Sequence, residues 1–231
     1  MSQRRATRSN SFILDQEESG VTPAIVRAGD RPPKTFVQQH RLQIRSILLL
    51  SMCAALLATD RPLEGTTTGL LLHALGAVLV VGAMLGRFWC YVYNAGARSK
   101  TVITAGPYSL CRNPIYVCSI VTAAGIGLLA QSFVLATAFS LVALAFYAHI
   151  VDGEERKLHY LHGAEYDGYR ERTSKYLPRF DRIEPGVIQR VPGAVLMRKV
   201  PKLAAMGLVF PAIELCNHLA GLVLPVVGRV F

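Results

Sequence analysis

Residues 115–150 read IYVCSIVTAAGIGLLAQSFVLATAFSLVALAFYAHI and contain no Asp, Glu, Lys or Arg. One straight α-helix of this length would measure about 54 Å, whereas the hydrocarbon core of a bilayer is only about 30 Å thick. The run is interrupted once, by Ala130-Gln131-Ser132. It therefore predicts two membrane helices joined by a tight turn near that interruption.

Further apolar runs surround this hairpin. Two precede it, Ile44 to Thr59 and Thr67 to Gly86, and one follows from Leu203 to Val227. The last run contains Pro211 and a polar trio, so it lies either across the membrane or in its interface. Only 17% of the residues are charged, against about 25% in soluble domains. The predicted fold class is all-α: a multi-pass transmembrane helical bundle of four to five membrane helices.

Basic residues collect between the apolar runs and give a net charge of +10. They are abundant in residues 1–40, in the loop 87–114 and in the region 152–202, whereas the turns 60–66 and 130–132 hold one between them. The positive-inside rule therefore places the three basic segments and the N-terminus in the cytoplasm. The membrane is either a bacterial inner membrane or a eukaryotic endomembrane. No basic-aromatic motif indicates a nucleic-acid partner, so we expect anionic membrane lipids instead.

The composition also divides the chain. Residues 1–40 are polar and basic and are expected to form a disordered cytoplasmic tail. Residues 41–180 form the predicted membrane core, and residues 181–231 form a linker and a C-terminal membrane or interfacial helix. The first apolar run begins only near Ile44, which argues against a cleaved signal peptide.

A first polar cluster, GPYSLCRNPIY at 106–116, stands where the loop meets the hairpin. Gly106-Pro107 is a turn signal, and Asn113-Pro114 is a helix entry because Asn can cap and Pro suits the first helical position. Such a helix start offers free N–H groups that can bind a carboxylate. The same residues could equally well serve only to anchor the helix.

A second polar cluster, EERKL at 154–158, follows the hairpin and continues to Tyr169. Adjacent carboxylates cannot share one helix face, so one can face a pocket while the other is solvated. A solvated helix with i,i+4 charge pairs explains the same pattern. The sequence shows no metal-ligand spacing and no dinucleotide or phosphate-loop fingerprint, and we predict no metal site.

Together these clusters resemble the isoprenylcysteine carboxyl methyltransferase family, which is related to the phospholipid methyltransferases. The family pattern GPYxxxR(H/N)PxY is met by residues 106–116. The pattern EExxL, followed by GxEYxxY and a PRF-like end, is met by residues 154–169 and 178–180. The resemblance covers roughly residues 67–180 and rests on both motifs in this order.

The resemblance implies a membrane-embedded enzyme with a cytoplasmic cofactor pocket and active site. Such an enzyme transfers a methyl group from S-adenosylmethionine to a lipid-like acceptor, either a prenylcysteine-type carboxylate or a lipid amine. It implies these cofactor-binding positions: Lys100, Thr101, Val102, Ile103, Tyr108, Arg112, Asn113, Pro114, Ile115, Tyr116 and Glu154.

Two positions concern the acceptor. His149 stands about where the family has an acceptor-binding Arg, which argues against a carboxylate acceptor because a neutral His binds carboxylates less well than Arg. A lipid amine must lose a proton, and His149 or Glu155 could accept it as the predicted catalytic residues. Two other functions stay open: a nicotinamide-dependent, sterol reductase-like enzyme, and a non-catalytic transporter or scaffold. The sequence does not indicate the oligomeric state.

Overall fold

The computed structural model describes residues 39–58, 63, 65–97, 101–185 and five single residues, 197, 200, 201, 208 and 215. All of them belong to the unit Lys34–Phe231. The elements bounded within it are α3 (Arg41–Ala58), α4 (Thr67–Ala97), α5 (Pro107–Leu110), α6 (Pro114–Leu129), α7 (Phe133–His162), α8 (Ala164–Arg172) and the short 3-10 helix η2 (Phe180–Arg182). In this part of the chain the regular structure is helical, with no strand, as the sequence predicts.

The predicted hairpin is confirmed: α6 and α7 are separated by Ala130, Gln131 and Ser132. The Ser132 hydroxyl accepts a hydrogen bond from the Leu135 N–H at 3.2 Å and so caps α7. Gly127 has no side chain at the place where the backbone of Ala136 comes closest. The hairpin therefore closes tightly because a glycine stands at the contact.

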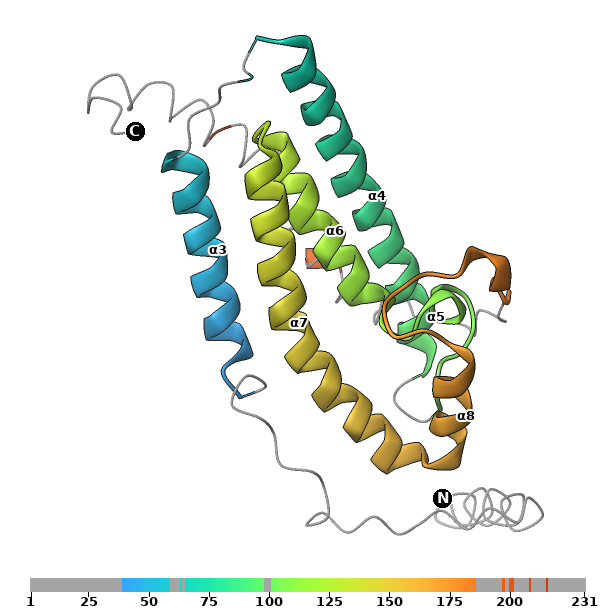
Figure 1. The fold of residues 1–231 in the computed structure, drawn as a ribbon. Helices are drawn as coiled ribbons and strands as arrows, with labels where there is room; N and C mark the ends of the chain where they lie inside the picture. The colour runs from blue at the N-terminus through green and yellow to red at the C-terminus, as the bar shows by residue number, and fades with distance from the viewer. Residues whose placement is uncertain are drawn as a thin grey trace, which may run out of the picture. The chain divides into compact units, whose positions relative to one another are not determined.

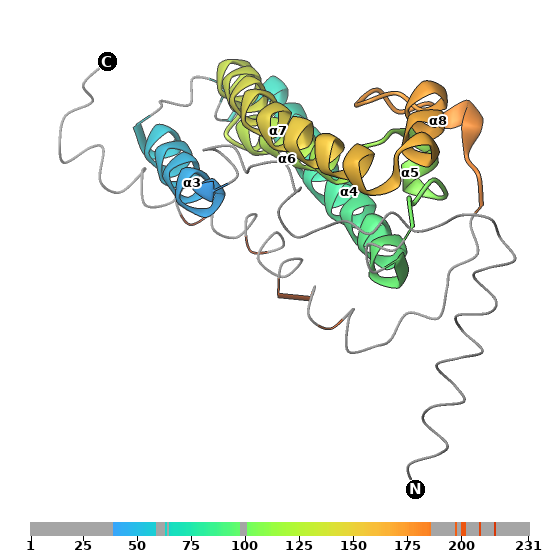
Figure 2. The same ribbon diagram turned by 90° about the horizontal axis from the view of Figure 1, so that it is seen from below.

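Helix α6 lies between α4 and α7, as two perpendicular views show (Figures 1 and 2). A Cβ atom added at Gly76 of α4 would lie 2.7 Å from the Gly125 carbonyl oxygen of α6, so the two backbones approach closely there. Buried side chains of α3, α4, α6 and α7 meet in one apolar cluster that includes Leu56, Val80, Ile126 and Phe139. Small residues at helix contacts are typical of membrane bundles.

The outward faces of the long helices are apolar and exposed. Only 28% of the apolar stretch of α4 and 22% of that of α7 is buried. Leu70 and Val78 of α4 are each 67% exposed, and Val134 of α7 is 78% exposed. A soluble protein rarely leaves such a surface in water, and both helices are long and apolar enough to cross a membrane. With the shorter apolar helices α3 and α6 they account for the first four predicted membrane elements.

One predicted boundary is wrong: helix α4 continues past Gly86 to Ala97, so the first part of the predicted loop 87–114 is helical. Helix α7 continues past the apolar run to His162 and carries the start of the second motif, in line with its interpretation as a helix. Arg87 does not end α4 because its guanidinium donates to the Ser119 hydroxyl at 2.7 Å and to the Tyr91 hydroxyl at 3.2 Å. The predicted segment 203–227 lies outside the described residues, apart from two single positions.

Candidate functional site

The first motif begins with a turn that requires glycine. Gly106 has φ +62°, and a Cβ atom there would run into the ring of Tyr93 on α4. Its N–H donates to the Glu184 carbonyl at 2.9 Å, and the Ser109 hydroxyl donates to the Gly106 carbonyl at 2.7 Å. The motif therefore packs on the end of α4 and binds the segment that follows α8.

Helix α6 starts where the sequence predicts, with Asn113 at the N-cap and Pro114 in the first turn. The Asn113 side chain, however, makes no capping hydrogen bond. Its amide nitrogen instead donates to Glu155 Oε1 at 2.9 Å and to the Lys175 carbonyl at 3.3 Å. The N–H groups of the first turn are therefore not capped by a side chain, and Asn113 links α6 to α7.

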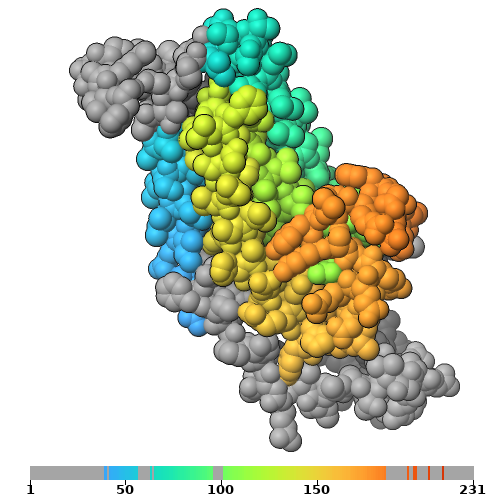
Figure 3. All heavy atoms as spheres, viewed as in Figure 1, coloured from blue at the N-terminus to red at the C-terminus, as the bar shows by residue number. Residues whose placement is uncertain are grey.

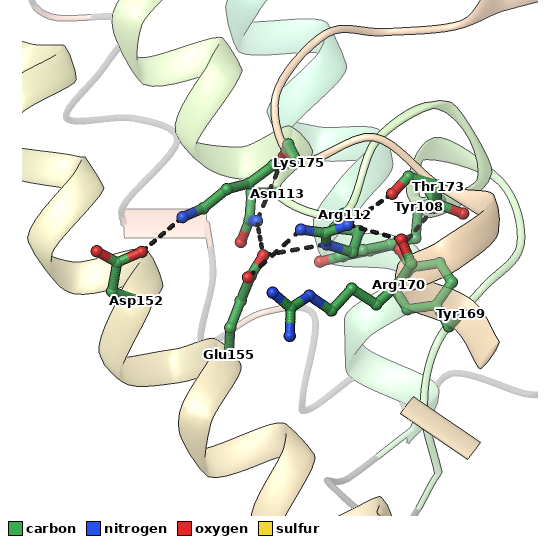
Figure 4. Close-up of polar contacts among 9 residues, drawn as sticks. All are labelled: Tyr108, Arg112, Asn113, Asp152, Glu155, Tyr169, Arg170, Thr173 and Lys175. Carbon is green, nitrogen blue, oxygen red and sulfur yellow. Dashed lines mark hydrogen bonds and ion pairs between the residues drawn. The ribbon is translucent and has the colours of Figure 1, made fainter. Parts of the chain in front are cut away.

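Glu155 is the point at which the two motifs meet (Figure 4). Besides Asn113, its carboxylate accepts from Arg112 Nε at 3.1 Å and from Arg112 Nη2 at 3.4 Å. Both side chains of this ion pair are largely buried, with 10% of Arg112 and 14% of Glu155 exposed. Arg112 also donates to the carbonyls of Arg170 and Thr173, at 2.9 and 2.7 Å. Arg112 thus joins α7, α8 and the start of α6.

A second junction lies between the tyrosines of the two motifs. The Tyr169 hydroxyl donates to the Tyr108 carbonyl at 2.7 Å, and the Asn94 amide donates to the Tyr108 hydroxyl at 3.2 Å. Burial is the main cause that raises the pKa of Tyr108 above its ordinary value, and the charge of Glu154 adds to it. Glu154 therefore lies near this phenol, while Glu155 on the next helical position faces Arg112.

Residues 173–184 run back along the first motif. The Arg112 N–H donates to the Ser174 carbonyl at 2.8 Å, and the Arg179 N–H donates to the Leu110 carbonyl at 3.0 Å. In the space-filling view, the orange atoms of α8 and this segment form a continuous cap beside the lower part of α7 (Figure 3). The predicted core boundary at 180 thus falls inside a segment that contacts the site.

The predicted catalytic residues differ in their surroundings. His149 is exposed on α7, and its Nδ1 lies 2.8 Å from the Ala145 carbonyl. Because a carbonyl oxygen only accepts, Nδ1 must carry the proton, which leaves Nε2 of the neutral ring as an acceptor. Both oxygens of Glu155 already accept hydrogen bonds. The proton-accepting role of either residue stays a prediction.

The remaining predicted cofactor residues lie around the start of α6. Thr101, Val102 and Ile103 form an irregular segment leading into the first motif, and Lys100 lies outside the described residues. Tyr116 is half-buried, and its ring packs against Tyr147 of α7 at 5.1 Å between centroids. Pro114 is buried and Ile115 half-buried at the same helix start. Apart from Lys100, the structure gathers these residues at one end of the α6–α7 hairpin.

A hollow of about 250 Å³ lies between α7, α8 and the segment after α8. It is lined by Asp152, Glu155, Arg156, His159, Tyr166, Arg170 and Lys175. Lys175 forms an ion pair with Asp152 at 2.5 Å (Figure 4), and this hydrogen-bonded contact raises the pKa of Lys175. Six of these seven residues were not among the predicted site residues.

Some of the missed residues carried a signal and others did not. Tyr166 and Tyr169 belong to the second motif, and their spacing of three places them on one face of a helix. Both are buried against the first motif or the hollow. Asp152, Arg170 and Lys175 have no pattern that distinguishes them from solvated charges. Lys175 reaches α7 only because residues 173–184 run back along the first motif.

The residues at the start of α6 and on α7 fit the polar groups of S-adenosylmethionine. That cofactor carries a carboxylate, an ammonium group and ribose hydroxyls beside its cationic sulfur. Pro114 has no N–H, and the Tyr116 and Val117 N–H groups donate to the Asn113 carbonyl at 3.1 and 3.2 Å. The start of α6 therefore offers the carboxylate the Ile115 N–H and the positive end of the helix dipole, because helix N-termini attract anions. The nearby Glu154 carboxylate suits the ammonium group or the hydroxyls as an acceptor.

Comparisons with known proteins show the family of this chain. The family model described as phospholipid methyltransferase matches residues 65–165, from the start of α4 into α8. The nickel-cobalt-cadmium resistance protein NccN of Alcaligenes xylosoxydans xylosoxydans is 30% identical over 199 residues, covering 85% of this chain and 92% of the relative. The cobalt-zinc-cadmium resistance protein CzcN of Cupriavidus metallidurans is 31% identical over 164 residues, covering 70% and 74%.

No solved structure matches the chain. The matched residues 65–165 contain both motifs up to the start of α8, and they contain the whole α6–α7 hairpin that joins them. The chain is therefore a membrane protein of the phospholipid methyltransferase family, similar over most of its length to NccN and CzcN.

Proposed function

We propose that this protein transfers a methyl group from S-adenosylmethionine to a lipid-like acceptor at the membrane surface. The observation that carries the proposal is the direct bonding of the two motifs: Arg112 and Asn113 hold Glu155, and Tyr169 holds Tyr108. These bonds bring the uncapped start of α6 and the carboxylate of Glu154 to one end of an otherwise apolar bundle. A polar cofactor and an apolar acceptor would meet at such an end.

Bound S-adenosylmethionine would supply a methyl group on a sulfonium, an electrophile that reacts by in-line displacement. The main tasks left to the protein are alignment and exclusion of water, which together can account for most of such a rate enhancement. Asn113 and Arg112 serve alignment, because their bonds to Glu155 fix the start of α6 against α7. We assign Glu155 to positioning in addition to its predicted proton-accepting role.

An amine acceptor needs a base, and we propose His149 for this role. It lies five residues before Glu154 on α7, which is about 7.5 Å along the helix axis. Its Nε2 is the free acceptor of the neutral ring. As the new C–N bond forms, the S–CH₃ bond breaks, its electron pair stays on sulfur, and the proton of the amine passes to this nitrogen. A carboxylate acceptor would not need His149.

The experiment is methyl transfer by the full chain in membranes supplied with S-adenosylmethionine labelled in the methyl group. Lipids are extracted and analysed by mass spectrometry for a labelled product. Glu154→Gln should abolish saturable cofactor binding in calorimetry, while Glu171→Gln on the exposed surface of α8 should leave it unchanged. Absence of saturable binding by the folded wild-type protein would refute the proposal.

The names of the relatives also suggest a biological process in which the reaction takes part. Both are named as resistance proteins for divalent metals: nickel, cobalt and cadmium for NccN, and cobalt, zinc and cadmium for CzcN. Within residues 39–58, 65–97 and 101–185, no group of three or more His, Cys, Asp or Glu residues could hold such an ion. We infer a role in metal resistance through a modified lipid. Growth in cadmium or cobalt should then depend on Glu154.

A further inference from the structure

The hollow between α7 and α8 has a charge pattern that the proposed methyl transfer does not use. Its two carboxylates are already neutralised, Asp152 by Lys175 at 2.5 Å and Glu155 by Arg112 at 3.1 Å. His159 contacts Asp167 of α8. These pairs leave no carboxylate in the lining without a cation.

Two cations of the lining, Arg156 and Arg170, are not paired in this way. The guanidinium groups of Arg156 on α7 and Arg170 on α8 form no hydrogen bond or ion pair with the part of the chain that the structure describes. Both line the hollow, one from each helix. Figure 4 shows Arg170 extending from α8 toward Glu155. Arg156 and Arg170 therefore bring two positive charges to the hollow from two different helices.

Tyr166 adds an unused donor to the same hollow. Its side chain is 2% exposed, and its hydroxyl has no hydrogen-bond partner among the described residues. The nearby Arg112 guanidinium only donates, so it cannot accept the Tyr166 proton. A phenol is protonated at neutral pH, and burial raises the pKa of Tyr166 further, to about 12. A buried donor without an acceptor is costly, and an anionic oxygen would satisfy it.

We infer that this hollow binds a phosphate-type anion, held between Arg156 and Arg170 and hydrogen-bonded by Tyr166. Arginine suits tetrahedral oxyanions because its planar fork donates two parallel hydrogen bonds. The volume of about 250 Å³ is below the roughly 300–1,000 Å³ of pockets for drug-sized ligands. It suits a phosphate group better than a whole nucleoside. The phosphate can belong to a lipid headgroup or be free in solution.

This inference does not depend on methyl transfer, and it is tested by binding alone. The full chain in maltoside micelles is titrated with inorganic phosphate, with dioctanoylglycerol phosphate and with dioctanoylglycerol, at constant ionic strength. The thermal unfolding midpoint reports binding, because a ligand of the folded state raises it. Dioctanoylglycerol has the same acyl chains without the phosphate, and so it measures any effect of the chains.

The expected result is a saturable rise of the midpoint with at least one phosphate probe and none with dioctanoylglycerol. A rise with both phosphate probes supports a site open to free phosphate, and a rise with the lipid alone supports a headgroup site. The double variant Arg156→Gln/Arg170→Gln should lose about tenfold or more in apparent affinity. Loss of a single hydrogen bond to a charged group already weakens binding by roughly this factor. Tyr166→Phe should weaken binding less, without changing the volume.

The matched control is Arg172→Gln/Arg182→Gln. It removes the same charge from exposed residues near α8 that do not line the hollow, so phosphate binding should stay as in wild type. Absence of a phosphate-dependent shift in the folded wild type would overturn the inference. So would an equal loss in both double variants. Loss of S-adenosylmethionine protection in Arg156→Gln/Arg170→Gln, with no effect of phosphate on wild type, would assign the hollow to the cofactor instead.

Discussion

Replacement of Glu155 by glutamine tests whether the buried ion pair holds the two motifs together. The carboxylate accepts from Arg112 at 3.1 and 3.4 Å and from Asn113 at 2.9 Å. Glutamine keeps the side-chain length and one acceptor oxygen but loses the charge. Arg112 is only 10% exposed, so water cannot replace the lost contact freely.

The size of the effect follows from what Arg112 keeps. A buried charge whose partner is removed entirely costs about 3–5 kcal/mol. Arg112 still donates to the carbonyls of Arg170 and Thr173, and one hydrogen bond to a charged group contributes about 1.5–3 kcal/mol. We therefore expect Glu155→Gln to lower the free energy of unfolding by about 2 kcal/mol. The coupling with Arg112→Gln should be roughly 1–2 kcal/mol.

The assay is reversible unfolding of the full chain in mixed micelles, applied to both single variants and to the double variant. Glu171→Gln on the exposed face of α8 is the control for loss of one carboxylate, with an expected change within about 0.5 kcal/mol. The reasoning is refuted if Glu155→Gln costs no more than Glu171→Gln. A coupling indistinguishable from zero would equally show that Arg112 and Glu155 do not act as a pair.

Three other perturbations test the local geometry. Gly106→Ala should lower the free energy of unfolding by about 1–3 kcal/mol, because φ is +62° and the added Cβ has no room. Gly168→Ala in α8 meets open space and should raise it by about 0.5–1 kcal/mol. Both changes are measured by unfolding. Gly127→Ala should prevent normal hairpin closure and reduce folded yield in membranes, whereas Gly82→Ala meets nothing within 4 Å and should not. Since the pKa of Tyr166 is raised from 10.0 to about 12, its contribution to stability is present below pH 10 and should be lost as pH rises toward 12; Tyr166→Phe should flatten that part of the stability–pH profile.

The helical hairpin could be predicted because a membrane limits helix length. An apolar run of about 54 Å has to turn once in a core of about 30 Å, and the only polar interruption lies at 130–132. The turn was therefore located within a residue or two. The ends of α4 and α7 could not be located in the same way, because both helices continue beyond their apolar runs. Residues 87–97 of α4 mix aromatic, small and polar side chains, and residues 152–162 of α7 are mostly polar. Such sequences fit a helix beyond the membrane as well as a loop.

The two motifs could be predicted to share one end of the bundle, but not how they bind each other. The sequence shows adjacent carboxylates on different faces of one helix, without indicating which of them faces the ligand. The structure turns Glu155 to Arg112 and leaves Glu154 near Tyr108. That choice depends on the rotation of α7 about its axis, which is set by its packing on α6 through residues such as Ile126 and Phe139. A rotation of one residue, about 100°, would exchange the two roles.

The cap formed by residues 173–184 explains why the lysine of the hollow has no sequence signal. Lys175 reaches Asp152 because the backbone of its segment is tied to the first motif at both ends, by the Arg112 and Gly106 N–H groups. Backbone hydrogen bonds of this kind place few demands on side-chain identity. The charged lining of the hollow is thus fixed by main-chain hydrogen bonds to a motif far earlier in the chain. It follows that substitutions in the first motif should disturb the hollow even where they touch none of its lining residues.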